Sequence, residues 1–228
     1  MQIIGHRGAR DLAPENTIAG FKEALKFKPD WIELDVRTSR DGIPFVIHDP
    51  RLGRLAGTRK AVSRISADTL KGLQTSHGQP LITLEKALEA IVPKAKVVIE
   101  IKTLRAVAPT AALLQTWYKK GYGPEYFLVQ SFWPHILRAV HKVDPKVRLG
   151  LLQHISPLRF TAVRSVPLYG VGFFHRAMPL QAVKLAKKRG LWVYAHTVDK
   201  LLEAKKLQNW GVDAIVTNRP DRFVKKVK

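Results

Sequence analysis

Short apolar runs alternate with stretches of helical periodicity along the whole chain. Runs rich in β-branched and aromatic side chains predict buried strands at 2–5, 31–36, 97–101, 127–131, 148–152, 170–174, 192–196 and 214–217. Apolar residues at helical spacing predict helices at 17–27, 84–91, 106–120, 134–142, 179–189 and 201–210. Strands that alternate with helices in this way predict a parallel sheet covered by helices.

Eight predicted strands favour a closed barrel over a doubly wound open sheet. The predicted fold class is therefore α/β, a single (β/α)8 TIM barrel over residues 1–228. Asn16 precedes the first helix as a candidate N-terminal cap. Gly121, Gly190 and Gly211 stand just past three helix ends, where a left-handed backbone is common. We see no linker or short repeat that would mark a second domain.

One segment after the second strand breaks the alternation. Asp41-Gly42 is a hairpin signal, so residues 45–48 are predicted to run back along 31–36. A two-residue loop would place Asp35 opposite His48. Residues 50–82 then form an irregular insertion rich in Arg, Gly and Ser. At the active face of a barrel such an insertion shapes substrate access, although it also fits a plain surface loop.

Composition is that of an ordinary globular protein, with 46% hydrophobic and 25% charged residues. The chain has no cysteine, which excludes disulfides, thiolate catalysis and cysteine-based zinc sites. Residues 1–4 lead straight into Gly5-His6-Arg7-Gly8 without the basic and apolar regions of a signal peptide. No apolar stretch approaches the ~18 residues of a membrane span. We therefore expect a cytoplasmic protein.

The charge balance is unusual, because 39 Lys and Arg face 18 Asp and Glu, for a net charge of +21. Such a field attracts phosphodiesters, anionic lipid headgroups and nucleic acid, and it also fits a merely well-solvated surface. Nucleic acid is not the expected partner, since no helix-turn-helix, zinc-finger or RNA-binding motif is present. Peripheral contact with an anionic membrane is a further alternative, and the three lysines of Val224–Lys228 would favour it. The sequence does not indicate an oligomeric state.

Charged side chains gather where the predicted strands end, which is where barrel enzymes carry their active sites. Glu33 and Asp35 lie two residues apart on one strand and so point the same way, as do Glu100 and Lys102 on another. The ends of the first strand and of the hairpin add four more polar residues: His6, Arg7, His48 and Asp49.

This inventory suits metal-assisted phosphodiester cleavage. Three carboxylates form a hard oxygen site for one divalent cation, Mg²⁺ or Ca²⁺. Arg7 can fork two phosphoryl oxygens, Lys102 adds a point charge, and two histidines suit general acid–base catalysis near neutral pH. Each residue alone also has an ordinary role as a salt-bridge partner or cap, so the inference depends on their combination.

Several motifs resemble those of the glycerophosphodiester phosphodiesterases in order and spacing, over essentially the whole chain. The more specific ones are Gly5-His6-Arg7-Gly8, Ala13-Pro14-Glu15-Asn16-Thr17, Glu33-Leu34-Asp35-Val36, His48-Asp49 and Ile99-Glu100-Ile101-Lys102. The weaker ones are Ser131-Phe132, Gly211-Val212-Asp213-Ala214-Ile215 and Arg219-Pro220-Asp221.

The resemblance implies a barrel that hydrolyses glycerophosphodiesters to an alcohol and glycerol 3-phosphate, with either water or a neighbouring substrate hydroxyl as the attacking group. It implies a metal site, an acid–base pair, phosphate-binding residues and supporting residues. By this resemblance Glu33, Asp35 and Glu100 would hold the metal, and His6 and His48 would be the acid–base pair. Arg7 and Lys102 would bind the phosphate, with Asn16 as a further substrate contact. Glu15 and Asp49 would support the site.

Two departures from the family pattern leave the substrate open. The family often has Trp-Thr-Val-Asn where this chain has His196-Thr197-Val198-Asp199, and Thr-Asp where it has Thr217-Asn218. His196 is therefore a candidate substrate contact, or else a buried, hydrogen-bonded histidine.

Two other functions compete with the first. One is a lysophospholipase D-like activity on membrane lysophospholipids, which the basic charge favours. The other is a catalytically idle, basic barrel that binds phosphate or nucleic acid. Such a binder has no need of three carboxylates, which repel phosphate in the absence of a metal.

Overall fold

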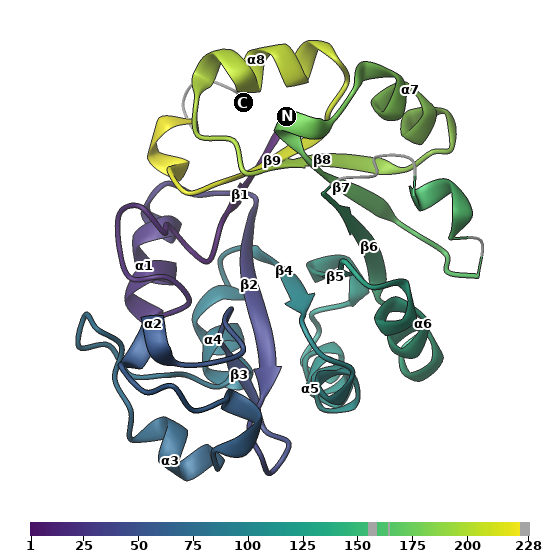
Figure 1. Cartoon of the computed structure of the whole chain (residues 1–228). Helices are drawn as coiled ribbons and strands as arrows, with labels where there is room; N and C mark the ends of the chain where they lie inside the picture. Colours follow the sequence, from purple (N-terminus) through teal and green to yellow (C-terminus); the bar gives the residue numbers. More distant parts are fainter. Residues whose placement is uncertain (155–158, 164, 224–228) are drawn as a thin grey trace.

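The computed structural model describes residues 1–154, 159–163 and 165–223. In this part of the chain, eight parallel strands form a closed barrel, because β1 pairs with both β2 and β9. The barrel strands are β1 (Gln2–Gly5), β2 (Trp31–Thr38), β4 (Lys96–Ile101), β5 (Phe127–Ser131), β6 (Arg148–Gln153), β7 (Gly170–Phe174), β8 (Trp192–His196) and β9 (Ala214–Thr217). The predicted (β/α)8 barrel is confirmed (Figure 1).

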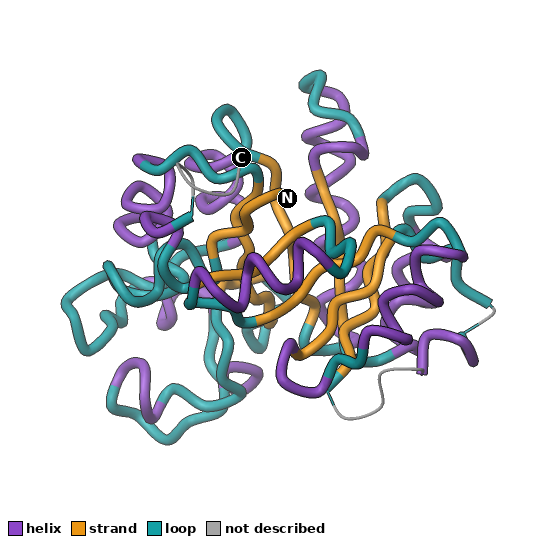
Figure 2. The backbone as a smooth tube through the Cα atoms, turned by 90° about the horizontal axis from the view of Figure 1, so that it is seen from above, coloured by secondary structure: helices purple, strands orange, loops and turns teal. Residues whose placement is uncertain are grey.

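Helices surround the barrel, as the two views show (Figures 1 and 2). They are α1 (Ile18–Lys26), α4 (Leu84–Ile91), α5 (Val107–Lys119), α6 (Pro134–Val143), α7 (Leu180–Lys188) and α8 (Leu201–Asn209). Short 3₁₀ helices are η1 (Val62–Arg64), η2 (Leu104–Ala106), η3 (Pro124–Tyr126), η4 (Arg159–Ala162), η5 (His175–Ala177) and η6 (Pro220–Arg222). The left-handed glycines expected after three helices have φ of 91°, 71° and 86° at Gly121, Gly190 and Gly211.

The cap of α1 differs from the prediction. Thr17 is the capping residue, since its Oγ1 accepts a hydrogen bond from the Gly20 amide at 3.0 Å. Asn16 instead has a left-handed backbone with φ of 56°, and its side chain turns towards β2. The residue that the sequence offered as a cap therefore belongs to the site described below.

The hairpin register is one residue away from the prediction. The strand β3 (Pro44–Val46) pairs with β2 so that Val36 faces Val46, and the Ile47 amide donates to the Asp35 carbonyl. Ser39 and Ile43 close a three-residue loop in which Gly42 has φ of 85°. A three-residue loop with a left-handed glycine is a regular alternative to the two-residue turn, and it places Asp35 beside Ile47 instead of His48.

The insertion at 50–82 is more ordered than predicted. It contains α2 (Gly53–Ala56), η1 and α3 (Ala67–Lys71). Its apolar side chains join the hairpin in a separate cluster of Phe45, Ile47, Leu52, Leu55, Val62, Ile65, Ala67, Leu70 and Leu81. Local packing therefore holds this segment at the edge of the barrel mouth. The treatment of 1–228 as one domain with an insertion stays a prediction.

Apolar side chains fill the barrel interior beneath the strand ends. This inner cluster contains Ile4, Trp31, Val98, Leu128, Leu152, Tyr194, Ala214 and Val216. Tyr194 is fully buried and donates to Gln130 Oε1 at 2.7 Å. Gly150 and Gly172 make room for it, since a Cβ at either position would lie within 2.7 Å of its ring or hydroxyl. The lumen is thus a packed floor for the polar residues above it.

None of the helices in the described ranges combines the length and the apolar character that a bilayer-crossing segment needs. The lysine-rich segment Val224–Lys228 lies outside the described residues. The cytoplasmic location stays a prediction.

Candidate active site

Three buried carboxylates meet where β2 and β4 pair. Glu33 and Asp35 share one face of β2, and Asp35 is the register partner of Glu100 on β4. One carboxylate oxygen from each of the three lies within 4.8 Å of the others. Their exposed fractions are 2%, 1% and 7%, so the three side chains form a buried acidic triad that could bind a cation.

The pKa values of the three carboxyl groups of the triad are shifted in different directions. Burial, reinforced by Asp35 and Glu100, raises the pKa of Glu33 well above its ordinary value. Burial and the charge of Asp35 raise the pKa of Glu100 to about 7. Burial acts on Asp35 in the same direction, but Lys102 and Arg7 outweigh it and hold the pKa of Asp35 below its usual range.

Two cations and an amide surround Asp35. Arg7 Nε lies 3.0 Å from Asp35 Oδ2, and Lys102 Nζ lies 2.9 Å from Asp35 Oδ1 and also contacts Glu100. Asn16 Nδ2 donates to Asp35 Oδ2 at 2.9 Å. The backbone of Arg7 is left-handed, with φ of 49°, and its amide donates to Glu33 Oε2 at 2.9 Å. The strained turn thus directs a donor onto the triad.

His6 also approaches Glu33. Its Nε2 is 4.0 Å from Glu33 Oε2, and its Nδ1 is 2.6 Å from Asn218 Oδ1. Asn218 Nδ2 donates to Asp199 Oδ2 at 3.0 Å, so the amide oxygen is the atom that faces His6. His6 Nδ1 is then the donor and Nε2 carries the lone pair. Burial, assisted by Arg7, lowers the pKa of His6 to about 4, which leaves the ring neutral.

Asp199 and Asn218 are site residues that the sequence reasoning recorded only as departures from a pattern. Asp199 accepts from the Asn218 amide at 2.8 Å and from Thr217 Oγ1 at 2.9 Å. A signal was available: Gly5 pairs with Thr217, so the residues that follow β1 and β9 lie side by side. His6 and Asn218 are those residues.

His48 reaches the site from the hairpin. Its Nδ1 donates to Asp49 Oδ1 at 2.7 Å, and Arg54 Nε donates to Asp49 Oδ2 at 2.7 Å. Burial lowers the pKa of His48, with Asp35 and Asp49 acting in the opposite direction. Since Asp35 is the largest of these opposing charges, His48 lies within its field although the hairpin register is not the predicted one.

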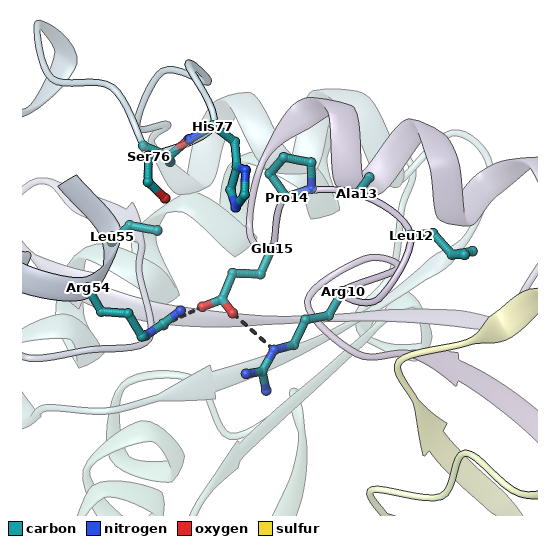
Figure 3. A pocket seen from close by; sticks show the side chains of 10 residues that line it. Arg10, Leu12, Ala13, Pro14, Glu15, Arg54, Leu55, Ser76 and His77 are labelled. Carbon is teal, nitrogen blue, oxygen red and sulfur yellow. Dashed lines mark hydrogen bonds and ion pairs between the residues drawn. The ribbon is translucent and has the colours of Figure 1, made fainter.

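Glu15 joins the barrel to the insertion. It accepts hydrogen bonds from Arg7 at 3.0 Å and from Arg54 at 2.6 Å, and Arg10 pairs with its second oxygen at 3.1 Å. Burial would raise the pKa of Glu15, but Arg54 and Arg7 outweigh it and lower it. The Arg10 and Arg54 contacts lie beside a cavity of about 350 Å³ between the loop that carries Glu15 and residues 75–77 (Figure 3). Glu15 therefore orients the arginine that contacts Asp35.

His196 lies apart from the acidic triad, at the end of β8. Its ring is 5.5 Å from that of His154, 6.1 Å from Phe132 and 6.3 Å from Phe174. Its Nε2 is buried without a hydrogen-bond partner in the described ranges, and burial lowers its pKa to about 3. The ends of β5 to β8 thus present aromatic and imidazole rings. Sequence reasoning did not single out His154.

The chain is similar to known phosphodiesterases over almost its full length. The model of the glycerophosphoryl diester phosphodiesterase family matches residues 6–222. The glycerophosphodiester phosphodiesterase of Caldanaerobacter subterraneus is 31% identical over 242 residues, which cover 99% of this chain and 97% of that protein. A glycerophosphodiester phosphodiesterase of Bacillus subtilis is 28% identical, with 97% and 85% covered.

Solved structures agree with the sequence comparison. A phosphodiesterase of Oleispira antarctica, in complex with the product sn-glycerol-3-phosphate, is 25% identical with a TM-score of 0.90 and 97% and 94% coverage. The glycerophosphodiester phosphodiesterase of Agrobacterium tumefaciens is 26% identical with a TM-score of 0.82 and 99% of each chain covered. The motif resemblance found in the sequence is therefore correct, and this chain belongs to the glycerophosphoryl diester phosphodiesterase family of phosphodiester hydrolases.

Proposed function

We propose that this chain hydrolyses glycerophosphodiesters to an alcohol and glycerol 3-phosphate, with one divalent cation held by Glu33, Asp35 and Glu100. The buried acidic triad carries the proposal, since its three carboxylates lie within 4.8 Å of one another and, among the residues that the structure describes, pair closely with two Lys or Arg side chains, Arg7 and Lys102. An all-oxygen donor set fits Mg²⁺ and Ca²⁺ equally. When bound, the cation would offset the charge of the phosphate and of the transition state. The Oleispira antarctica relative with bound glycerol 3-phosphate supports this class of substrate.

Arg7 and Lys102 are the proposed phosphate ligands. Both lie at the triad, and both direct their charge at Asp35. The guanidinium of Arg7 can hold two phosphoryl oxygens, and Lys102 can hold one. Asn16 orients Asp35 through its amide, so its role as a substrate contact stays a prediction, as does that of His196.

We assign His6 as the general base and His48 as the general acid. His6 is neutral, buried and backed by an uncharged amide, so its Nε2 lone pair can take the proton of the attacking hydroxyl. His48 is backed by the carboxylate of Asp49, which opposes the lowering of the His48 pKa by burial and so favours the protonated ring that must give its proton to the leaving alkoxide. Asp49 and Glu15 support these groups through their common partner Arg54.

Asn218 and Asp199 are proposed to hold His6 in its reactive tautomer. We expect Asn218→Asp to lower kcat about 10- to 100-fold with little change in KM, because the new carboxylate repels Asp199 and disturbs the contact with His6. The exchange Asp199→Asn with Asn218→Asp restores one carboxylate and one amide, and we expect it to recover most of the kcat. Steady-state kinetics of both single variants and the double variant measure this. A double variant no better than Asn218→Asp alone would contradict the positioning role.

The reaction is tested by release of glycerol 3-phosphate from glycerophosphocholine and glycerophosphoethanolamine, with Mg²⁺, with Ca²⁺ and with chelator. We expect release that depends on the cation. Turnover of lysophosphatidylcholine alone would favour the lysophospholipase D-like function. Phosphate binding without turnover of either substrate class would favour the idle binding barrel.

Stability should depend on pH through Glu100. Its pKa in the folded chain is about 7, above the ordinary value of 4.5, so the folded state holds a proton that the unfolded chain has released between these pH values. The contribution of Glu100 to the free energy of unfolding of the metal-free protein should therefore fall as pH rises through this window, by at most about 1.4 kcal/mol per pH unit. Thermal melts in chelator from pH 5 to 8 measure it, with Glu100→Gln as the control that lacks this component. If stability falls equally steeply with pH in the wild type and in Glu100→Gln, the raised pKa of Glu100 is wrong.

A further inference from the structure

A second cavity, of about 380 Å³, lies beside the candidate active site and is lined by arginines. It lies between the end of β2, the segment after the hairpin and the start of η2. Its polar lining consists of three guanidinium groups and three hydroxyls, from Arg37, Arg51, Arg105, Thr38, Ser63 and Thr103. No acidic side chain lines it. By contrast, three other cavities include Glu15, Asp30 and Glu85 in their linings.

The three arginines are held in place by backbone carbonyls and not by close carboxylates. Arg37 Nε donates to the His48 carbonyl at 2.8 Å, Arg51 Nη1 to the Arg59 carbonyl at 3.1 Å, and Arg105 Nη2 to the Arg40 carbonyl at 3.0 Å. A backbone carbonyl fixes the direction of a guanidinium group and leaves its charge in place. The ion pairs formed by arginines in the described ranges involve other residues, so none of these three forms a direct ion pair there. The carboxylates of Asp35, Glu100 and Asp49 act on Arg37 at longer range.

A hydroxyl in the same cavity also lacks a partner. Thr103 Oγ1 is buried and has no hydrogen bond within the described part of the chain. Buried polar atoms are normally paired, so this hydroxyl is free to serve a ligand. Rigid guanidinium groups together with hydroxyl donors form a site for a phosphate group, whose oxygens accept from both.

We propose that this arginine-lined cavity binds a phosphate group, supplied either by a soluble phosphate ester or by a lipid headgroup. Arg37 lies two residues beyond Asp35 on β2, and Thr103 follows Lys102 directly. Two residues of strand span about 7 Å, so the site lies next to the acidic triad. None of Glu33, Asp35 and Glu100 is among the residues that line it. The proposal does not depend on the hydrolytic reaction.

Calorimetric titration with inorganic phosphate at constant ionic strength tests the proposal. Chelator is present throughout, because the triad without a cation repels phosphate. We expect Arg51→Gln with Arg105→Gln to weaken phosphate binding at least tenfold, and Thr103→Val to weaken it several-fold. Both arginines are exposed, so their replacement should leave the fold intact, which a thermal melt checks. The charge-matched control is Lys119→Gln with Lys188→Gln, exposed on α5 and α7. Equal affinities in the arginine variant and this control would overturn the proposal.

Vesicle sedimentation distinguishes the two sources of phosphate. The vesicles are phosphatidylcholine with and without phosphatidylglycerol. If the site takes a lipid phosphate, the arginine variant should lose binding to the anionic vesicles while the lysine control keeps it. If the two variants sediment alike while phosphate titration still separates them, the ligand is a soluble phosphate.

Discussion

Replacing Glu33 by glutamine should abolish hydrolysis and at the same time stabilise the metal-free protein. Glutamine keeps the acceptor for the Arg7 amide and removes an ionisable group whose charge is costly to bury beside Asp35 and Glu100. Because burial and these neighbours raise the pKa of Glu33, the ionised triad is unfavourable without a cation. Loss of a cation ligand removes several kcal/mol of transition-state stabilisation, which corresponds to a rate about a thousandfold lower.

The expected loss of activity and gain of stability in Glu33→Gln are tested by measuring rates and melting temperatures together. In chelator we expect Glu33→Gln to melt above the wild type, by about 2–4 °C for each kcal/mol gained. Added Mg²⁺ or Ca²⁺ should stabilise the wild type and leave the variant nearly unchanged. Glu85→Gln, exposed on α4, is the control and should change neither property. A Glu33→Gln protein that keeps normal activity, or that melts below the wild type in chelator, would contradict the proposed metal site.

Substitution of the two histidines should separate the base from the acid. With glycerophosphocholine, His6→Gln and His48→Gln should each lower kcat by about 10²–10⁴-fold, the usual contribution of general acid–base catalysis. A substrate whose alcohol is p-nitrophenol needs little protonation of its leaving group. On that substrate His48→Gln should recover much of its rate, whereas His6→Gln should stay slow, because the attacking hydroxyl must still lose its proton.

Kinetics on both substrates give the readout, with His135→Gln on the exposed face of α6 as the control. The reverse pattern, with recovery of His6→Gln, would exchange the two roles. Recovery of neither variant would show that leaving-group protonation does not limit the reaction, and the acid role of His48 would then be wrong.

Hydrophobic periodicity was sufficient to predict the barrel because each of its strands is a short apolar run bounded by clear breaks. The ends of the runs at 31–36 and 97–101 were then enough to place Glu33, Asp35 and Glu100 near one another, since parallel strands end on the same side of a barrel. Local signals alone could not decide the hairpin register, because Asp41-Gly42 fits both a two-residue and a three-residue loop.

Contacts between distant segments were the part that the sequence left unseen. Asn218 follows the last strand and meets His6 only because the barrel closes between β9 and β1. Asn16 fits the local pattern of a helix cap, and the motif resemblance alone placed it at the site. Its side-chain amide donates to Asp35, a contact between distant segments that the local pattern does not predict. The insertion seemed irregular because its apolar residues are spaced for packing against the hairpin and follow no helical or strand period.

The most direct test of the central claim is to follow glycerophosphocholine by phosphorus NMR with the wild-type chain, in Mg²⁺, in Ca²⁺ and in chelator. The proposed site predicts conversion to glycerol 3-phosphate and choline with at least one of the two cations and none in chelator. Conversion to glycerol and phosphocholine would show that the wrong phosphate ester bond is broken, since the proposed reaction breaks the bond to choline. Conversion that continues undiminished in chelator would contradict the dependence on a cation.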